Sequence, residues 1–344
     1  MLPNTLKMVY LKSLIGFLLL SLSVSAQTEI QVILNGAKDH KVDKVDAFDL
    51  SQVEYYKYKF SDTLLFRFKK DTIDCYNIRY HENGKMYRQQ IWLNPGRIII
   101  KAHIGEDKLI IDTVINSSFY YQVTEFNEKY ASLLKARDST GTNDFLLTSF
   151  KNNFDNPFSI HVGFIFITQN QNNRDQLLRL KALTDSQGSR FSWFLLYPMV
   201  SVRLEKLLTV KKIDLERFSF LNEQKKKSKI ALDSAAFYVI DCWFLSCMPC
   251  VAQHKDIKEN VGKLRSRNIE VIGVSTDRDW KKWKKYLSEH EYSWRNFLED
   301  KSMPLTKELG ISIFPTYIVL NKNGDILDTY NSFKEVLIRF HIND

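Results

Sequence analysis

The sequence predicts an α/β domain at the C-terminal end of the chain, preceded by an all-β domain and a helical connector. Apolar and polar residues alternate over residues 29–113, and apolar residues recur at helical spacing over 117–210. An almost unbroken apolar run at 237–244 then leads into two cysteines that stand three positions apart. Alternation is typical of strands with one covered face, whereas a continuous apolar run is typical of a central strand covered on both faces.

The first 26 residues have the pattern of an export signal. Lys7 and Lys12 are their only charges, and the apolar run Leu14–Leu22 leads to Val24-Ser25-Ala26. We expect cleavage after Ala26 and a periplasmic location, with an uncleaved anchor as the alternative. Removal of the two lysines lowers the formal charge from +9 to +7 (9 − 2). An exported destination argues against nucleic acid as the partner of this basic chain.

Residues 27–115 are predicted to form the all-β domain, a small sandwich or barrel. The alternating residues are Tyr56, Tyr58 and Phe60; Tyr76, Ile78 and Tyr80; Ile98–Ile100; and Leu109–Ile111. Turn signals separate these runs at Asn83-Gly84, Asn94-Pro95-Gly96 and Gly105-Glu106-Asp107.

Residues 116–211 are predicted to be a helical connector. Apolar residues follow one another by four, three, four and three positions at Phe119, Val123, Phe126, Tyr130 and Leu133. Further helices are expected at Asp144–Phe150, Ser159–Thr168, Arg174–Leu183 and Phe191–Leu208. The basic run Lys225-Lys226-Lys227 lies between two short strand candidates and is expected to be an exposed loop.

The motif Cys247-Met248-Pro249-Cys250 follows the apolar run directly and opens a helix-compatible stretch. Proline is tolerated in the first helical turn, so Cys247 is expected at the helix N-terminus. Unpaired N–H groups there favour a thiolate, the attacking species in disulfide exchange. A bare CxxC is also half of a zinc site, but no second such pair or histidine cluster is present. We therefore predict a redox pair and no metal.

A second landmark is the run from Gly310 to Leu320, in which Pro315 precedes β-favouring residues and a turn at Asn321-Lys322-Asn323-Gly324. With this run, the chain resembles the thioredoxin-fold family: "FYVIDCWFLSCMPC" is similar to the active-site strand and turn, and "GISIFPTYIVLNKNGDI" to the cis-proline segment and terminal hairpin. The strand–helix–strand–helix interval between Cys250 and Pro315 is similar to the TlpA-like and ResA-like periplasmic branch. The resemblance covers residues 212–344.

The resemblance implies a thiol–disulfide oxidoreductase acting as a reductase on disulfide-containing proteins. Cys247 would be the nucleophile and Cys250 the resolving cysteine, with Asp241 as buried acid and Pro315 as cis-proline. Met248, Pro249 and Phe314 would face the substrate. No diffusible cofactor is implied, because electrons pass through the dithiol. A membrane-bound electron donor is the implied partner.

The sequence departs from the family in the residue before the first cysteine, Ser246, which is usually tryptophan. It also has no obvious counterpart at 271–274 of the lysine that partners the buried acid. Two other functions therefore stay open. One is a binding or scaffolding protein that retains a divergent thioredoxin-like domain. The other is a thiol peroxidase, although Phe244 stands where that chemistry usually has a hydroxyl residue.

Three further residues carry expectations of their own. Cys75 is predicted to be a half-exposed lone thiol, and a disulfide between it and Cys242 is disfavoured because the two lie in different domains. Cys242 is expected to be a small buried apolar residue, and Trp243 to lie in the core beneath the active site. His254, one helical turn after Cys250, is expected to be a solvated surface histidine.

Overall fold

The computed structural model describes residues 28–35, 42–49, 55–59, 63–69, 71–82, 84–106 and 108–342. The expected export signal lies outside these residues. The chain divides into two compact units. One holds the residues up to Phe145 with 152–159 and 193–195, and the other holds the remainder. No helix within the described ranges is both long enough and apolar enough to cross a membrane.

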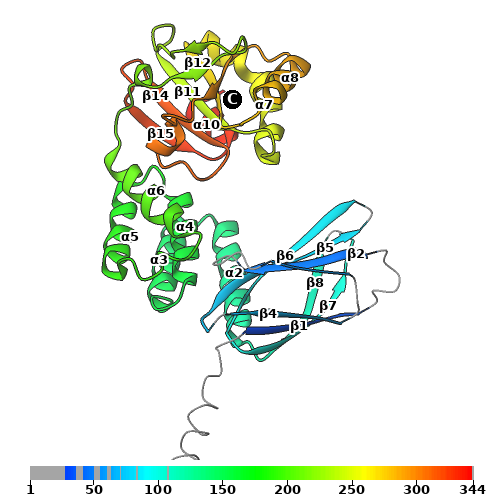
Figure 1. Ribbon diagram of the computed structural model, residues 1–344. Helices are drawn as coiled ribbons and strands as arrows, with labels where there is room; N and C mark the ends of the chain where they lie inside the picture. Colours follow the sequence, from blue (N-terminus) through cyan, green and yellow to red (C-terminus); the bar gives the residue numbers. More distant parts are fainter. Residues whose placement is uncertain are drawn as a thin grey trace, which may run out of the picture. The chain divides into compact units, whose positions relative to one another are not determined.

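The first unit contains two four-stranded sheets (Figure 1). The first has the order β4-β1-β7-β8, with β4 at Thr63–Phe68, β1 at Thr28–Asn35, β7 at Arg97–Ile104 and β8 at Leu109–Ile115. The second has the order β3-β2-β5-β6, with β3 at Tyr55–Lys59, β2 at Val42–Asp49, β5 at Asp74–Glu82 and β6 at Lys85–Leu93. Side chains of both sheets, such as Val32 and Tyr80, share one buried core. The predicted all-β region is thus confirmed, and its form is a sandwich.

Cys75 corrects one expectation, because its side chain is fully buried rather than half-exposed. Its cross-strand neighbour on β6 is Trp92, which packs edge-on against Phe158 at 5.1 Å between ring centroids. Helical aromatic residues therefore cover the second face of this part of the sheet, which alternation alone does not reveal. The Gln90 amide lies 2.9 Å from the Cys75 sulfur, and burial raises the thiol pKa.

Helices follow the β region, as predicted. Their bounds are α2 Ser118–Ala136, α3 Ser139–Asn152, α4 Phe158–Gln169, α5 Arg174–Gln187 and α6 Tyr197–Thr209. Helix α6 begins six residues later than expected, with Pro198 in its first turn, where the lost N–H costs little.

The second unit contains a seven-stranded mixed sheet in the order β10-β9-β13-β12-β11-β14-β15 (Figure 1). The strands are β9 Phe220–Leu221, β10 Lys227–Ser228, β11 Phe237–Trp243, β12 Ile269–Ser275, β13 Arg295–Glu299, β14 Thr316–Asn321 and β15 Ile326–Tyr330. Its helices are the short 3-10 helix η2 Leu215–Arg217 and the α-helices α7 Met248–Ser266, α8 Trp280–His290, α9 Leu305–Glu308 and α10 Phe333–Arg339. The expected strand–helix–strand–helix interval after Cys250 is confirmed.

Strand β11 lies at the centre of this sheet, parallel to β12 and antiparallel to β14. Val239 faces the apolar side chains of α7 and α10, whereas Ile240 faces a cluster that includes Leu305 of α9. Both faces of β11 are therefore covered, as its unbroken apolar sequence predicts. Cys242 is buried and makes no disulfide, as expected.

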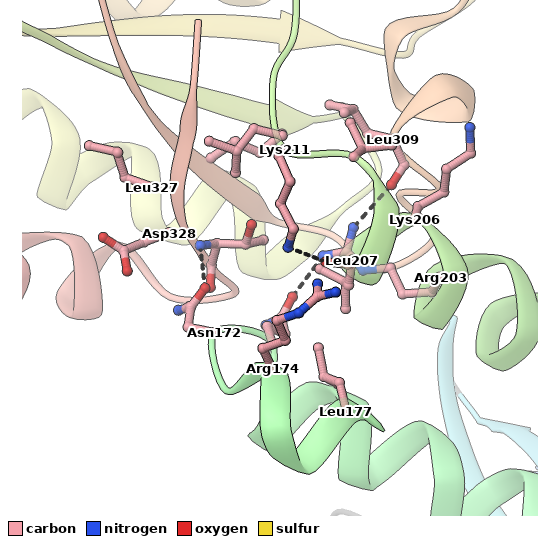
Figure 2. A pocket seen from close by; sticks show the side chains of 15 residues that line it. Asn172, Arg174, Leu177, Arg203, Lys206, Leu207, Lys211, Leu309, Leu327 and Asp328 are labelled. Carbon is pink, nitrogen blue, oxygen red and sulfur yellow. Dashed lines mark hydrogen bonds between the residues drawn. The ribbon is translucent and has the colours of Figure 1, made fainter. Parts of the chain in front are cut away.

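Helices α4–α6 belong to the same compact unit as this sheet. Asn172, which precedes α5, accepts a hydrogen bond of 2.8 Å from the Thr329 backbone N–H and donates one of 2.9 Å to the Thr329 carbonyl (Figure 2). The Asn172 amide thus makes the two hydrogen bonds that a neighbouring strand would make to Thr329, and it joins the α4–α5 turn to the edge strand β15.

Candidate redox site

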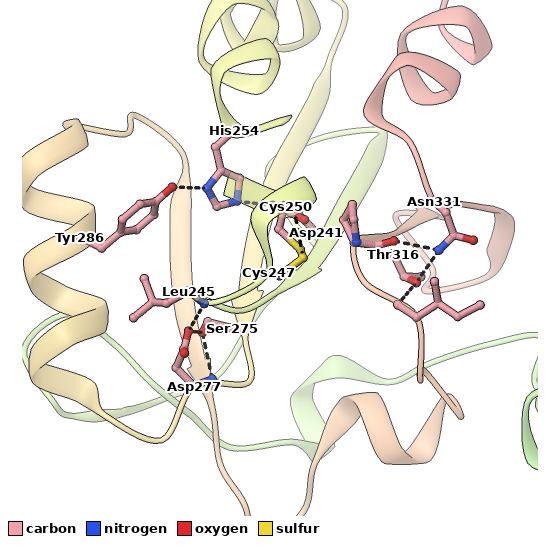
Figure 3. The surroundings of a disulfide bond; sticks show 12 residues. Asp241, Leu245, Cys247, Cys250, His254, Ser275, Asp277, Tyr286, Thr316 and Asn331 are labelled. Carbon is pink, nitrogen blue, oxygen red and sulfur yellow. Dashed lines mark hydrogen bonds and ion pairs between the residues drawn. A yellow bond between two sulfur atoms is a disulfide. The ribbon is translucent and has the colours of Figure 1, made fainter. Parts of the chain in front are cut away.

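Cys247 and Cys250 form a disulfide where β11 leads into α7, with an S–S distance of 2.01 Å (Figure 3). Cys247 is the N-cap of α7, and its sulfur lies 3.2 Å from the backbone N–H of Cys250. The side chain of Cys247 is 6% exposed, whereas that of Cys250 is fully buried. Reduction would therefore leave one sulfur reachable and aligned with the helix N-terminus, and the other covered.

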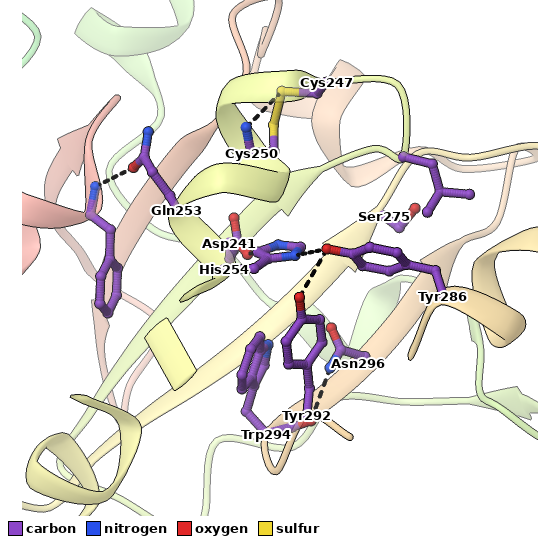
Figure 4. Close-up of polar contacts among 12 residues, drawn as sticks. Asp241, Cys247, Cys250, Gln253, His254, Ser275, Tyr286, Tyr292, Trp294 and Asn296 are labelled. Atoms are coloured by element: carbon purple, nitrogen blue, oxygen red, sulfur yellow. Dashed lines mark hydrogen bonds and ion pairs between the residues drawn. A yellow bond between two sulfur atoms is a disulfide. The ribbon is translucent and has the colours of Figure 1, made fainter. Parts of the chain in front are cut away.

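A buried carboxylate lies beneath the disulfide (Figures 3 and 4). Asp241 sits on β11 with no exposed surface, and one of its oxygens has no hydrogen-bond partner in the described structure. Burial raises the pKa of Asp241, and its hydrogen bond and charge interaction with His254 oppose part of that rise. The buried acid that the sequence predicts is thus present.

His254 is the partner of this carboxylate, so the expectation of a solvated histidine is wrong. Its Nε2 lies 3.2 Å from an Asp241 oxygen, and its Nδ1 lies 2.9 Å from the Tyr286 hydroxyl. The ring is fully buried and packs edge-on against Trp243, with 4.6 Å between ring centroids. Trp243 itself is fully buried, as predicted.

The polar chain continues outward from His254 through two tyrosines (Figure 4). The hydroxyls of Tyr286 and Tyr292 lie 2.9 Å apart, and both side chains are partly exposed. Burial raises the pKa of each tyrosine, so both hydroxyls stay protonated at neutral pH and can pass a proton along hydrogen bonds. The four side chains form a continuous route from the buried carboxylate toward solvent.

The substrate-facing residues suggested by sequence lie around the disulfide with different exposures. Met248 is 74% exposed and Pro249 is also exposed. Phe314 is half-buried and packs edge-on against Phe244, with 5.1 Å between ring centroids. The Phe314–Pro315 bond is cis, which confirms the expected cis-proline.

Sequence reasoning missed the residues that fix the two turns of the site. Asp277 accepts hydrogen bonds from the Leu245 backbone N–H at 2.9 Å and from the Ser275 hydroxyl at 2.7 Å, which holds the turn before Cys247 (Figure 3). Asn331 donates to the Pro315 carbonyl at 2.8 Å and to the Thr316 hydroxyl at 3.0 Å. Only an Asp and an Asn in loops mark these positions in the sequence, and such residues are common in any loop.

Among the described residues, no group of three or more His, Cys, Asp or Glu side chains is arranged to hold a metal ion.

Comparison with known proteins finds a match for the C-terminal part of the chain. Residues 236–326 match the family model described as thioredoxin-like. A search of curated proteins finds no match.

Solved structures of thiol–disulfide proteins are similar to part of the chain. A thiol:disulfide interchange protein from Bacteroides sp. is 19% identical over 37% of this chain and 86% of its own, with a TM-score of 0.33. The thioredoxin domain of a thiol-disulfide oxidoreductase from Bacteroides vulgatus is 18% identical over 39% and 98%, with a TM-score of 0.35. A putative interchange protein DsbE from Chlorobium tepidum is 18% identical over 38% and 95%, with a TM-score of 0.34.

Proposed function

We propose that this protein, whose residues 236–326 match the family model described as thioredoxin-like, is an exported thiol–disulfide oxidoreductase that reduces disulfides in other proteins. The observation that carries the proposal is the asymmetry of the pair: Cys247 caps a helix and is the more exposed sulfur, while Cys250 is buried next to a polar chain. Attack and resolution need two thiols that differ in this way.

The reaction runs in two exchange steps. The Cys247 thiolate attacks a substrate disulfide, which forms a Cys247–substrate disulfide and releases the first substrate thiolate. Cys250, deprotonated, then attacks the sulfur of Cys247, which re-forms the Cys247–Cys250 disulfide and releases the second substrate thiolate. Two electrons pass from the dithiol to the substrate, and each released thiolate takes up a proton.

Asp241, beneath the disulfide, would accept the Cys250 proton during the second step. Its raised pKa brings a carboxyl group closer to the pH at which a general base works efficiently. His254 holds the carboxylate from the other side and connects it through Tyr286 to Tyr292, which gives the proton a way out. Met248, Pro249 and Phe314 form the surface that a substrate chain would touch, and the buried Pro315 would shape the turn that presents Phe314.

An oxidising compartment requires a source of electrons for a reductase. The export signal expected at residues 1–26 would direct the protein out of the cytoplasm, and a membrane-bound electron donor would then re-reduce the Cys247–Cys250 disulfide. Both statements rest on the sequence.

Substrate trapping tests the proposal. With Cys250→Ser, a substrate joined to Cys247 has no internal route of release, so high-mass adducts should accumulate in cells and disappear with reductant. Mass spectrometry of the adducts would identify substrates and donor.

Cys247→Ser is the matched control, because it also leaves one thiol of the pair, but the fully buried one, and should trap far less. If folded, exported Cys250→Ser forms no more reductant-sensitive adducts than Cys247→Ser, the oxidoreductase proposal fails. A binding or scaffolding role would then be favoured.

A further inference from the structure

A small pocket away from the disulfide gathers positive charge. Its cavity of about 120 Å³ is lined by the end of α6, the start of α5 and the β14–β15 edge of the sheet. Four cationic side chains line it, Arg174, Arg203, Lys206 and Lys211, against the single carboxylate of Asp328. That carboxylate is engaged with Arg339 at 2.7 Å, and Lys206 is paired with Glu308 at 3.6 Å.

The other three cations have only neutral partners. Arg203 donates to the Leu309 carbonyl at 3.4 Å and to the Gln171 side-chain oxygen at 2.7 Å. Arg174 donates to the Leu208 carbonyl, and Lys211 donates to the Leu207 carbonyl. No described carboxylate forms an ion pair with any of the three.

The buried charge of Arg203 lowers the stability of the folded protein when the pocket is empty. Its side chain is 3% exposed, and its Nε–H is buried with no hydrogen-bond partner in the described structure. Burial lowers the pKa of the guanidinium to about 10, so it still carries its charge at neutral pH. A buried charge without a counter-ion costs several kcal/mol. An anion in the pocket would remove that cost.

Arg174 and Lys211 are exposed, and their cationic ends turn toward Arg203 (Figure 2). Burial and the charge of Arg174 together lower the pKa of Lys211, which shows that the two charges interact. The pocket therefore has a buried guanidinium at its base and two exposed cations at its mouth.

We propose that this pocket binds a phosphate group. Guanidinium groups pair with the oxygens of phosphate and carboxylate in a two-pronged geometry. Three unpaired cations favour the doubly charged phosphate over a carboxylate. The cavity of about 120 Å³ is large enough for several water molecules, so it has room for one tetrahedral oxyanion. Free phosphate and a small phosphate ester present the same oxygens to these three cations.

Calorimetric titration of the full mature protein tests this proposal. Inorganic phosphate should bind saturably with a stoichiometry near one, at a constant ionic strength set with sodium chloride. Glycerol phosphate in a parallel titration distinguishes a free ion from an ester, and acetate tests a single negative charge. Arg174→Gln with Lys211→Gln should weaken phosphate binding at least about tenfold, because the double variant removes two charged hydrogen-bond donors to the phosphate oxygens.

The matched control is Lys281→Gln with Lys334→Gln, which removes two exposed helical lysines and the same total charge. It should leave the phosphate affinity unchanged. Arg203→Met, checked for folding by circular dichroism, should abolish saturable binding. Absence of saturable binding to the wild type, or equal weakening by the pocket and control variants, would overturn the proposal.

Discussion

At Asp241, burial and a neighbouring imidazole act on one carboxylate in opposite directions. Burial disfavours the charged form, whereas the His254 ring, 3.2 Å away, favours it. Burial dominates, so the folded protein holds the Asp241 proton more tightly than the unfolded chain does. Ionisation of Asp241 therefore costs folding free energy.

Asp241→Asn is expected to stabilise the oxidised protein in a pH-dependent manner. In the wild type, the free energy of unfolding should fall as pH rises from about 4, the ordinary pKa of aspartate, through the raised pKa of the folded state. Asparagine has no proton to lose there, so its advantage should grow over this range. Denaturant unfolding of both proteins at pH 4, 6 and 8 measures the difference in their free energies of unfolding. An advantage that is the same at all three pH values would contradict the assignment.

Alkylation of the reduced protein should modify a single cysteine first. Cys247 has the N-cap position and some exposed surface, while Cys250, Cys75 and Cys242 are fully buried. Brief treatment with iodoacetamide near neutral pH, followed by peptide mass mapping, should find label at Cys247. Labelling of the denatured protein at all four cysteines is the control. Faster labelling of Cys250 would reverse the proposed roles.

Residue identity predicted the disulfide and the buried acid, but not the surroundings of His254 and Cys75. The unbroken apolar run indicated a covered strand, and the resemblance to the thioredoxin fold implied that Asp241 within it is the buried acid. His254 lies one turn after Cys250, where spacing gives its face of α7 but not what covers that face. Tyr286 and Tyr292, more than thirty residues later, cover it. Cys75 is covered in the same way by distant aromatic side chains.

At the scale of elements, the two turns of the site depend on single polar side chains. Asp277 fixes the turn between β11 and α7, and Asn331, just after β15, fixes the turn that holds Pro315. The strands and helices around them were predictable from apolar periodicity. The turns were not, because their hydrogen bonds join loops that are distant in sequence.

Asn331→Ala is expected to lower the free energy of unfolding by about 1–3 kcal/mol, because the Pro315 carbonyl and the Gln171 amide lose a partner. Asn323→Ala is a suitable control, since Asn323 lies exposed in the β14–β15 turn and should change stability by less than about 0.5 kcal/mol. Urea unfolding measures both variants. Equal effects of the two substitutions would show that Asn331 does not hold the turn.

At the scale of the whole molecule, the second compact unit is larger than the thioredoxin-like segment that sequence delimits at 212–344. Most of the helical segment α4–α6 belongs to this unit. Three hydrogen bonds join the segment to the thioredoxin-like part: Asn172 to Thr329 of β15, Gln171 to Asn331, and Arg203 to Leu309. The boundary at residue 212 remains a prediction about the family match. Cooperative packing extends further toward the N-terminus, and no local pattern in the sequence marks such contacts.

A fragment of residues 146–344 should therefore be more stable than one of residues 212–344. The shorter fragment loses the hydrogen bonds that Asn172, Gln171 and Arg203 make to it. Urea midpoints of the two oxidised fragments provide the comparison, and Asn172→Ala in the longer fragment should remove part of the difference. Identical midpoints would show that α4–α6 do not support the sheet.

The hydrogen bonds from Arg203 through Gln171 and Asn331 reach the carbonyl of Pro315, beside the disulfide. This continuity has a thermodynamic consequence. If an anion bound at Arg203 changes the free energy of reducing the disulfide, the reduced and oxidised proteins must bind that anion with different affinities. The two free-energy differences are equal. Titration of each redox form with the same anion measures that linkage directly, without any substrate.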